Sequence, residues 1–218
     1  NIIMSLKIYE RTSFKNIYVL PPMGDEGLAI GSAILTAIDF EQDLTWLRSF
    51  KMPYFGDSYS RKEVKLALQE FNNITFEDVE KNWPEKAAKS VSEGKICSLF
   101  HGRMEFGPRA LGNRSIVADP CRESTRQRIN STIKRRPNYQ PFCPSILEEE
   151  RLRLFKDSFS HKHMAIAFRM REEYIPDLPC AVHVDGTARP QFVEEEDNPS
   201  YYRYLKALKE LTGYGVSL

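Results

Sequence analysis

The sequence has no long apolar run and almost no net charge. No stretch approaches the roughly 20 apolar residues of a membrane-spanning helix, so we expect no association with a membrane. Lys and Arg number 31 against 30 Asp and Glu, a formal net charge of +1. A balance this even gives no whole-molecule case for binding nucleic acid, whose phosphates attract strongly basic proteins.

Cysteine is scarce as well. The four cysteines lie far apart without a CxxC pair, which argues against both a zinc knuckle and a disulfide framework. The first residues lack the apolar segment of a signal peptide. We therefore expect a cytoplasmic protein with reduced thiols.

The remaining sequence alternates helical and strand patterns, as α/β proteins do. Its 218 residues are 41% hydrophobic and 28% charged, enough for one large domain or two small ones. Longer helices are predicted at 1–10 (with no capping residue before it), 28–40 (buried, rich in small residues), 60–71, 84–93 and 199–212. Shorter helices are predicted at 122–133 and 147–156. Buried strands are predicted at 16–20 and 96–100, and further strands at 115–118, 140–147, 163–169, 180–184 and 190–194.

Positive charge is concentrated in one stretch. Residues 101–136 hold nine Lys or Arg and three acids, a local excess of nine minus three, or six. Within it, HGRMEFGPRALGNRS (101–115) mixes three glycines with three arginines. Glycine lets a backbone approach a ligand closely, and guanidinium forks suit phosphate oxygens. The stretch predicts an anion pocket, with a solvated surface loop as the alternative.

Three further segments carry candidate ligand contacts. Lys134 and Arg136 share one side of the chain if the segment before Pro137 is extended; a solvated basic turn is the alternative. Asp185 and Arg189 follow a predicted strand, where α/β proteins often bind ligands, although Asp-Gly there is also hairpin chemistry. Asp25 precedes a predicted helix and is either a metal or phosphate contact or a helix cap.

Four of these segments together resemble the O-carbamoyltransferase family of nodulation proteins and antibiotic-tailoring enzymes. The resemblance rests on GRMEFGPRALGNRSIVADP (102–120), INSTIKRRPNYQPFCPSILEEE (129–150) and HVDGTARPQFV (183–193), with NIYVLPPMGDEGLAIGSAI (16–34) before them. A match such as MEFGPRALGNRS is far more specific than a lone glycine pattern. The resemblance spans nearly the whole chain.

The resemblance implies two domains. Residues 1–45 look like the end of an N-terminal actin/Hsp70-like ATPase domain, followed by a linker at 46–54. Residues 55–218 look like a carbamoyltransferase domain, truncated at its C-terminus. That domain is expected to be a twisted mixed sheet with flanking helices, similar to threonylcarbamoyl-adenylate synthases.

The resemblance also implies an activity. Such enzymes use ATP with Mg²⁺ and carbamoyl phosphate; the C-terminal domain makes carbamoyl adenylate, and the carbamoyl group passes to a hydroxyl on a sugar-like acceptor. That transfer is implied to need an iron-type metal in the N-terminal domain, with Asp25 as a ligand in the full-length protein.

Residue roles follow from the same motifs. Arg109 and Lys134 are implied to contact the phosphates or the carbamoyl group, and Arg189 the adenylate. Arg136 and Asp185 are implied to support them. Gln140 departs from the family, in which many members have Arg before Pro-Phe. A neutral contact therefore replaces a charged one there.

Two other functions stay open at this stage. The first is an RNA-binding module of the tRNA-modification type, against which the basic stretch holds only Phe106 as a stacking aromatic. The second is a catalytically silent scaffold, because of Gln140. The acceptor, the oligomeric state and nucleotide binding by this chain alone are not readable from the sequence.

Overall fold

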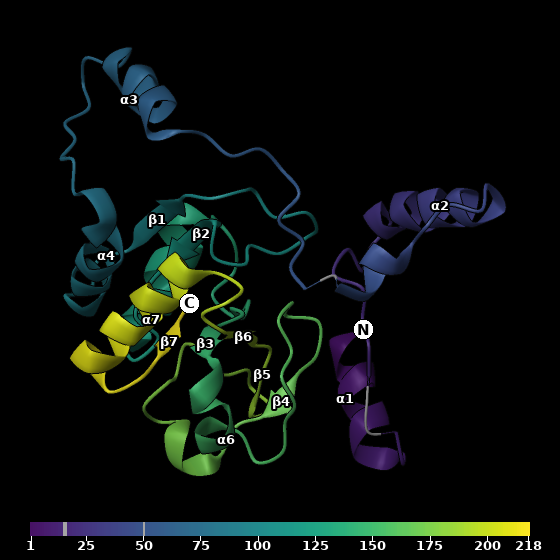
Figure 1. The fold of residues 1–218 in the computed structure, drawn as a ribbon. Helices are drawn as coiled ribbons and strands as arrows, with labels where there is room; N and C mark the ends of the chain where they lie inside the picture. Colours follow the sequence, from purple (N-terminus) through teal and green to yellow (C-terminus); the bar gives the residue numbers. More distant parts are fainter. Residues whose placement is uncertain (15–16, 50) are drawn as a thin grey trace.

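The computed structural model describes residues 1–14, 17–49 and 51–218. Figure 1 shows a main body built from the second half of the chain, with α1 (Ile2–Arg11) and α2 (Glu26–Asp39) beside it and α3 (Arg61–Gln69) projecting from it. The mixed α/β class is as expected. The strands, however, form three small sheets rather than one twisted sheet.

The central sheet is the mixed one, in the order β6-β3-β7. β3 (Ser145–Leu147) runs parallel to β6 (Gln191–Val193) and antiparallel to β7 (Val216–Ser217). In the register, Ser145 lies opposite Gln191. All three strands are buried, including their polar residues Ser145, Gln191 and Ser217.

Two antiparallel pairs flank this sheet. β1 (Cys97–Phe100) pairs with β2 (Arg114–Val117), and β4 (Phe168–Arg169) pairs with β5 (Thr187–Ala188). The loop between β1 and β2 therefore contains the glycine- and arginine-rich motif. Its two ends are fixed side by side by the β1-β2 ladder.

The helix α7 (Pro199–Thr212) covers the central sheet, and α4 (Trp83–Ser92) packs against α7 and β1. The buried side chains of α7 meet the sheet. α7 follows its sequence signals closely: the Asn198 side chain accepts a hydrogen bond from Tyr201 N at its start, and Gly213 ends it with φ +84°. The helix predicted at 199–212 is confirmed.

Most other predicted helices form, with changed details. Ser60 and Glu63 make a capping box at the start of α3. The first helix does have a cap, because the Asn1 side chain accepts from Ile3 N and Met4 N. The helix predicted at 122–133 divides into α5 (Glu123–Gln127) and a π-helical segment, η3 (Arg128–Ile133). The remaining short helices of the described residues are η1 (Thr45–Ser49), η2 (Glu80–Asn82), η4 (Glu148–Glu150), α6 (Arg151–Leu154) and η5 (Glu172–Tyr174).

The strand predictions were less accurate. Residues 17–20 form no strand and are not buried, and residues 15–16 of that prediction lie outside the described part. The strands predicted at 140–147 and 163–169 shrink to their last few residues, and residues 180–184 form turns. Residues 163–169 and 180–184 are apolar because they pack into the core largely as irregular chain, with Ile166 and Ala181 fully buried.

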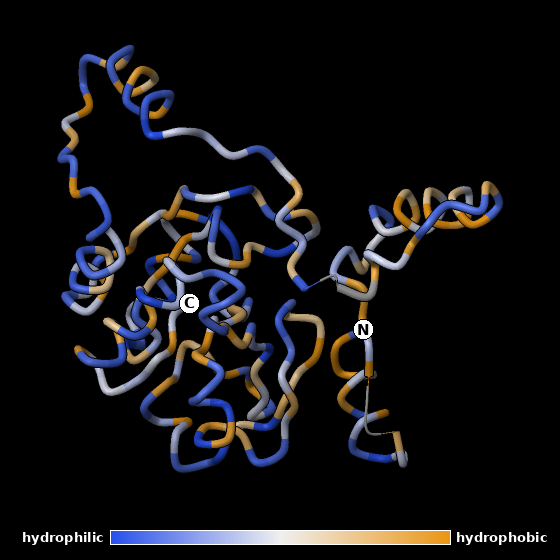
Figure 2. Tube along the Cα trace, in the orientation of Figure 1, coloured by the Kyte–Doolittle hydropathy of each residue, from blue (hydrophilic) through white to orange (hydrophobic). Residues whose placement is uncertain are grey.

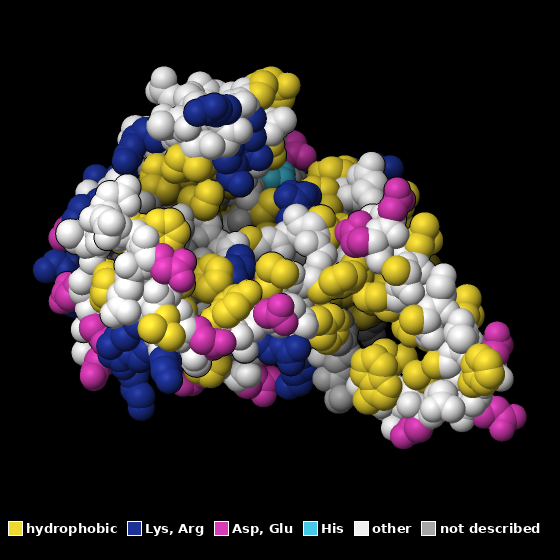
Figure 3. Space-filling view, turned by 90° about the horizontal axis from the view of Figure 1, so that it is seen from above, with side chains coloured by type: hydrophobic (Ala, Val, Ile, Leu, Met, Phe, Trp, Pro, Cys, Tyr) yellow, Lys and Arg dark blue, Asp and Glu magenta, His cyan; other side chains and the backbone are white. Residues whose placement is uncertain are grey.

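α2 is not buried, contrary to the prediction. None of its residues is buried, and Leu28, Leu35 and Ile38 are each more than half exposed. Figure 2 shows α2 as a largely hydrophobic segment away from the main body. In Figure 3, hydrophobic side chains gather on the part of the molecule that extends to the lower right. The apolar character was predicted correctly, but most apolar side chains of α2 stay exposed in the described structure.

None of the helices in the described ranges combines the length and apolarity that crossing a bilayer requires.

Candidate anion-binding site

A cavity of about 180 Å³ lies between the β1–β2 loop, the π-helical segment and the chain leading into β3. Three cationic residues line it, Arg109, Lys134 and Arg136, and no Asp or Glu does so among the described residues. Water occupies about 30 Å³ per molecule, so the cavity takes an anion of phosphate size. Whole organic cofactors occupy pockets of roughly 300–1,000 Å³, so a nucleotide would extend outside it.

The loop that carries Arg109 is shaped by one buried carboxylate. Glu105 Oε1 accepts hydrogen bonds from the backbone N–H groups of Leu111 (2.8 Å), Asn113 (2.8 Å) and Arg114 (3.2 Å). Three donors on one carboxylate oxygen fold the segment 106–114 back over Glu105. The sequence showed this glutamate only as an interruption among glycines and arginines.

Side-chain amides extend this support into the core. Asn113 Nδ2 donates to Arg103 O (2.7 Å), and Asn198 Nδ2 donates to Asn113 Oδ1 (2.8 Å). Gln191 Nε2 donates to Leu111 O (3.0 Å). The loop is thus joined to β6 and to the start of α7, so Arg109 is presented by a fixed scaffold.

Arg109 itself is half-buried and incompletely paired. Its Nε is out of contact with solvent and has no hydrogen-bond partner in the described structure. Burial lowers the pKa of Arg109, Cys143 opposes that shift, and the neighbouring Arg189 and Arg136 lower it further. A buried guanidinium donor without an acceptor is costly, which is the expected state of a group that meets an anionic ligand.

The π-helical segment places the other two cations. Lys134 N donates to Ile129 O (2.8 Å), five residues earlier, and Arg135 then turns the chain with φ +46°. The segment is therefore a tight turn. The sequence predicted an extended segment here, and that prediction is wrong. Lys134 and Arg136 reach the same cavity because of that turn. π-helical segments occur often at functional sites.

Arg136 is held by a buried asparagine that the sequence analysis did not single out. Asn130 is fully buried; its Oδ1 accepts from Arg136 Nε (2.7 Å), and its Nδ2 donates to the carbonyls of Asn138 (3.3 Å) and Gln140 (3.1 Å). The Arg136 guanidinium also lies over the Phe142 ring at 5.1 Å. Asn130 fixes both Arg136 and the following loop.

Arg189 does not line the cavity itself but contacts a residue that does. Its Nε and Nη2 donate to Cys143 Sγ at 3.0 and 2.6 Å, and Cys143 lines the cavity. Arg189 thus adds a fourth positive charge beside Arg109, Lys134 and Arg136. The predicted Arg109, Lys134, Arg136 and Arg189 come together, although they derive from three separate segments.

The positive groups weaken one another's charged forms. Partial burial lowers the pKa of Lys134, and the charges of Arg136 and Arg109 lower it further. Like charges at close range repel strongly where water is excluded. An anion in the cavity would relieve this repulsion for every cation at once.

Three other predicted residues lie elsewhere. Asp185 does not line the cavity; its Oδ1 accepts from Thr187 N (3.0 Å) and Thr187 Oγ1 (2.7 Å). Partial burial acts to raise the pKa of Asp185, but these hydrogen bonds hold it below its usual value. With Gly186 at φ +75°, Asp185 serves the turn before β5. The side chain of Gln140 does not line the cavity either.

Asp25 does not fit a metal within this chain. It is exposed, makes no capping hydrogen bond to α2 and joins no group of three metal-ligating side chains in the described ranges. One such group is present elsewhere, Glu194, Glu196 and Asp197. Lys162 Nζ lies 2.7 Å from Glu194 Oε2 and 2.6 Å from Asp197 Oδ2, so a lysine already pairs with two of the three carboxylates.

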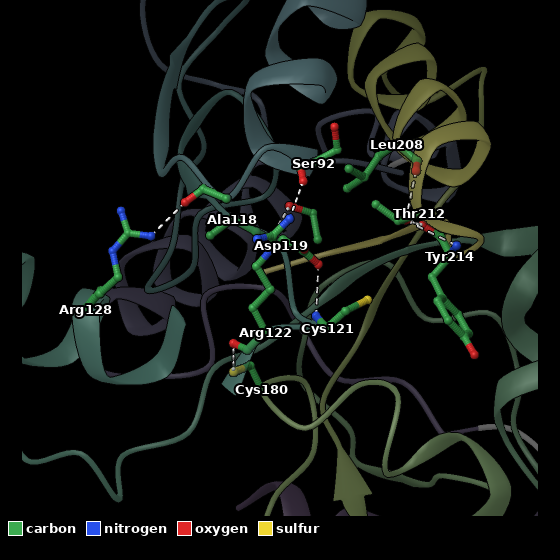
Figure 4. A network of polar contacts seen from close by, with 12 residues as sticks. Ser92, Ala118, Asp119, Cys121, Arg122, Arg128, Cys180, Leu208, Thr212 and Tyr214 are labelled. Atoms are coloured by element: carbon green, nitrogen blue, oxygen red, sulfur yellow. Dashed lines mark hydrogen bonds and ion pairs between the residues drawn. The ribbon is translucent and has the colours of Figure 1, made fainter. Parts of the chain in front are cut away.

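Most of the remaining basic residues of 101–136 have structural roles. Arg122 Nε donates to Asp119 Oδ2 (3.0 Å) and Nη2 to Ser92 O (2.6 Å), while Arg128 Nη1 donates to Gly94 O (2.7 Å) (Figure 4). Arg103, Arg114 and Arg126 also donate to backbone carbonyls. These arginines are thus engaged in contacts within the protein itself, which weighs against the RNA-binding alternative.

Comparisons with known proteins agree with this layout. A family model described as the carbamoyltransferase C-terminus matches residues 88–218, and one described as the carbamoyltransferase N-terminus matches residues 1–34. The first match contains every residue that lines the cavity.

Individual relatives are similar over nearly the whole chain. An uncharacterized protein of Methanocaldococcus jannaschii is 57% identical over 219 residues, 99% of this chain and 36% of that protein. Nodulation protein NolNO of Sinorhizobium fredii is 33% identical, over 100% of this chain and 32% of its own length. The 3'-hydroxymethylcephem-O-carbamoyltransferase of Streptomyces clavuligerus is 30% identical, over 93% of this chain and 36% of its own length. The chain thus spans about a third of the length of these relatives.

Among solved structures, a variant of P. abyssi Sua5 is similar to 65% of this chain and 38% of its own, with a TM-score of 0.40 and 15% sequence identity.

Proposed function

The chain belongs to the carbamoyltransferase family, and from this premise we propose that residues 88–218 form the carbamoyl-donor site of an ATP-dependent O-carbamoyltransferase. One observation carries the proposal: Arg109, Lys134 and Arg136 converge on a cavity of about 180 Å³ that no carboxylate lines in the described structure. Carbamoyl phosphate is a small dianion whose size and charge match that cavity.

The residues divide the work of binding. Arg109 offers an unpaired Nε, and Lys134 offers an ammonium at the cavity rim. Fixed cations hold the phosphoryl oxygens and stabilise the negative charge that builds on the leaving phosphate. Because Asn130 and Glu105 hold the cation-bearing segments in place, little reorganisation is needed when the ligand binds.

A nucleotide step is part of the same proposal. Water would first cleave carbamoyl phosphate to carbamate and phosphate; a carbamate oxygen would then bond to the α-phosphorus of ATP as the bond to the β-phosphate breaks, giving carbamoyl adenylate and pyrophosphate. Arg189 is the cation proposed to face the adenylate. Since no Asp or Glu lines the cavity in the described ranges, the Mg²⁺ that accompanies ATP would be held by the nucleotide's own phosphates.

Transfer to an acceptor is proposed for the longer protein. The Streptomyces clavuligerus relative is named for transfer of a carbamoyl group to a hydroxymethyl group, which supports a hydroxyl-bearing acceptor here. The acceptor-side metal would need ligands beyond Asp25, so no step of transfer is assigned to this chain.

Calorimetric titration tests the donor site. Carbamoyl phosphate and ATP-Mg²⁺ should each bind the chain. Arg109→Ala should lower the affinity for carbamoyl phosphate by at least about tenfold, as expected for a charged hydrogen bond worth roughly 1.5–3 kcal/mol. Arg128→Ala is the matched control, because Arg128 donates to Gly94 O and does not line the cavity. Equal losses in both variants would reject the assignment.

A further inference from the structure

Cys143 and Arg189 are neighbours by strand register. β3 and β6 are parallel, with Ser145 opposite Gln191. Two residues before each of these, Cys143 lies beside Arg189. Ser145 Oγ donates to Gln191 Oε1 (2.9 Å) one step further along. The contact between Cys143 and Arg189 is therefore set by the central sheet.

The contact has an unusual donor-acceptor balance. Both Nε and Nη2 of Arg189 donate to the single Cys143 Sγ, at 3.0 and 2.6 Å. Sulfur is a weak hydrogen-bond acceptor, whereas phosphate oxygens accept from a guanidinium fork in strong bidentate pairs. An anion in the adjoining cavity would therefore compete successfully for the same two donors.

Charge makes the exchange still more favourable. Arg189 lies close enough to Arg109 to disfavour its charged form, and Cys143 is the polar side chain that meets Arg189 at the cavity wall. Without an acceptor there, repulsion from Arg109, Lys134 and Arg136 would turn Arg189 toward solvent. With a carboxylate there, Arg189 would be neutralised and held away from ligand.

We propose that Cys143 is a positioning residue that holds Arg189 at the wall of the anion cavity through a weak two-point contact and releases it to the oxygens of the bound ligand. This inference rests on the proposed function of the cavity. Cys143 acts through Arg189 and forms no bond to the carbamoyl group. The role explains why a thiol, and not a carboxylate, faces the guanidinium fork.

A double-mutant cycle on the whole chain, read by calorimetry with inorganic phosphate, tests the inference. Cys143→Ala should weaken phosphate binding by about 3–10-fold, the range of one orienting hydrogen bond. The same substitution should change little in an Arg189→Ala background. Cys143→Ser, which restores an acceptor, should bind within about twofold of the parent chain.

The outcomes separate the two claims. If phosphate binds the parent chain and depends on Arg109, but Cys143→Ala has no effect or has the same effect with and without Arg189, the positioning role is wrong and the cavity assignment stands. If phosphate does not bind the parent chain, the cavity assignment fails and the positioning role fails with it. Far-UV circular dichroism and thermal unfolding verify that each variant folds; should Cys143→Ala not fold, the Cys143→Ser cycle carries the comparison, and a several-fold loss in that variant overturns the role.

Discussion

Glu105 sets the conformation of the loop that carries Arg109. Its Oε1 is the shared acceptor for the N–H groups of Leu111, Asn113 and Arg114, and the residue is only 9% exposed. Few carboxylates accept three backbone bonds while facing the protein interior. The loop conformation, and with it the position of Arg109, depends on this one side chain.

Glu105→Ala should destabilise the protein by roughly 2–4 kcal/mol, because three buried backbone donors lose their acceptor. Glu105→Gln keeps an acceptor oxygen and should cost less. Urea denaturation measures both, with the exposed Glu70→Ala as a control expected within about 0.5 kcal/mol of the parent. A Glu105→Ala variant as stable as Glu70→Ala would contradict the assigned role.

Lys134 makes anion binding pH-dependent on the alkaline side. Partial burial and the charges of Arg136 and Arg109 lower its pKa below the usual 10.5, so it loses its proton at a lower pH than an ordinary lysine. The neutral amine does not attract phosphate. Affinity should therefore decline as the pH rises toward 10.5, with proton uptake on binding.

Phosphate titrations between about pH 7.5 and 10 measure this decline. Lys134→Arg should flatten it, because a guanidinium stays charged throughout that range. Lys95→Arg, a change at an exposed ion pair with Glu93, should leave the decline as it is. If the decline in affinity at alkaline pH persists unchanged in Lys134→Arg, a group other than Lys134 causes it.

Residue types were easier to predict than residue roles. The cation-rich stretch predicted an anion pocket, and the family resemblance singled out Arg109, Lys134 and Arg136 within it; these three do converge. Glu105 and Asn130 could not be chosen, because their importance comes from backbone partners fixed only in the folded chain. Asp185 was assigned to a ligand, but its hydrogen bonds serve a turn.

At the scale of elements, the π-helical segment Arg128–Ile133 decides where Lys134 points. Successive residues of an α-helix are rotated by about 100° around its axis. Removing one residue from this segment would therefore turn Lys134 by about that angle. The sequence predicted one uninterrupted helix here, since helical periodicity does not distinguish an α-helix from a short π-helical insertion. The strands at 140–147 and 163–169 were overpredicted because buried irregular chain and buried strand share the same apolar composition.

Deleting Ser131 should convert the segment to α-helix and turn Lys134 away from the cavity. We expect phosphate affinity to fall by at least about tenfold while the far-UV circular dichroism spectrum keeps its helical shape. Ser131→Ala is the matched control, since it removes only the hydrogen bond to Asn138 Oδ1 (3.1 Å). Unchanged binding in the deletion variant would show that the π-helical register does not matter.

At the scale of the whole molecule, α2 leaves its apolar side chains largely exposed, whereas α7 of the main body buries several of its own. Leu35, 65% exposed, buries little in the described structure, whereas Leu208 of α7 is fully buried. The two domains implied by the sequence, with their limits at 45 and 55, stay a prediction. The mixed α/β class followed from the alternating pattern; the division into three small sheets depends on long-range pairing that the pattern does not encode.

Leu35→Lys should change the free energy of unfolding of the main body by no more than about 0.5 kcal/mol. Leu208→Ala, which opens a cavity between α7 and the sheet, should cost roughly 2–5 kcal/mol. Urea denaturation followed by circular dichroism compares them. A loss of several kcal/mol for Leu35→Lys would mean that α2 is packed against the body in solution.

The central claim is that one cavity, built by three distant segments, holds the phosphoryl group of the carbamoyl donor. A crystal structure of the chain grown with carbamoyl phosphate tests it most directly. The account predicts phosphoryl oxygens within hydrogen-bond distance of the Arg109 guanidinium and the Lys134 ammonium, with Arg189 turned from Cys143 toward the ligand. A donor bound elsewhere, or an empty cavity at saturating carbamoyl phosphate, would contradict it.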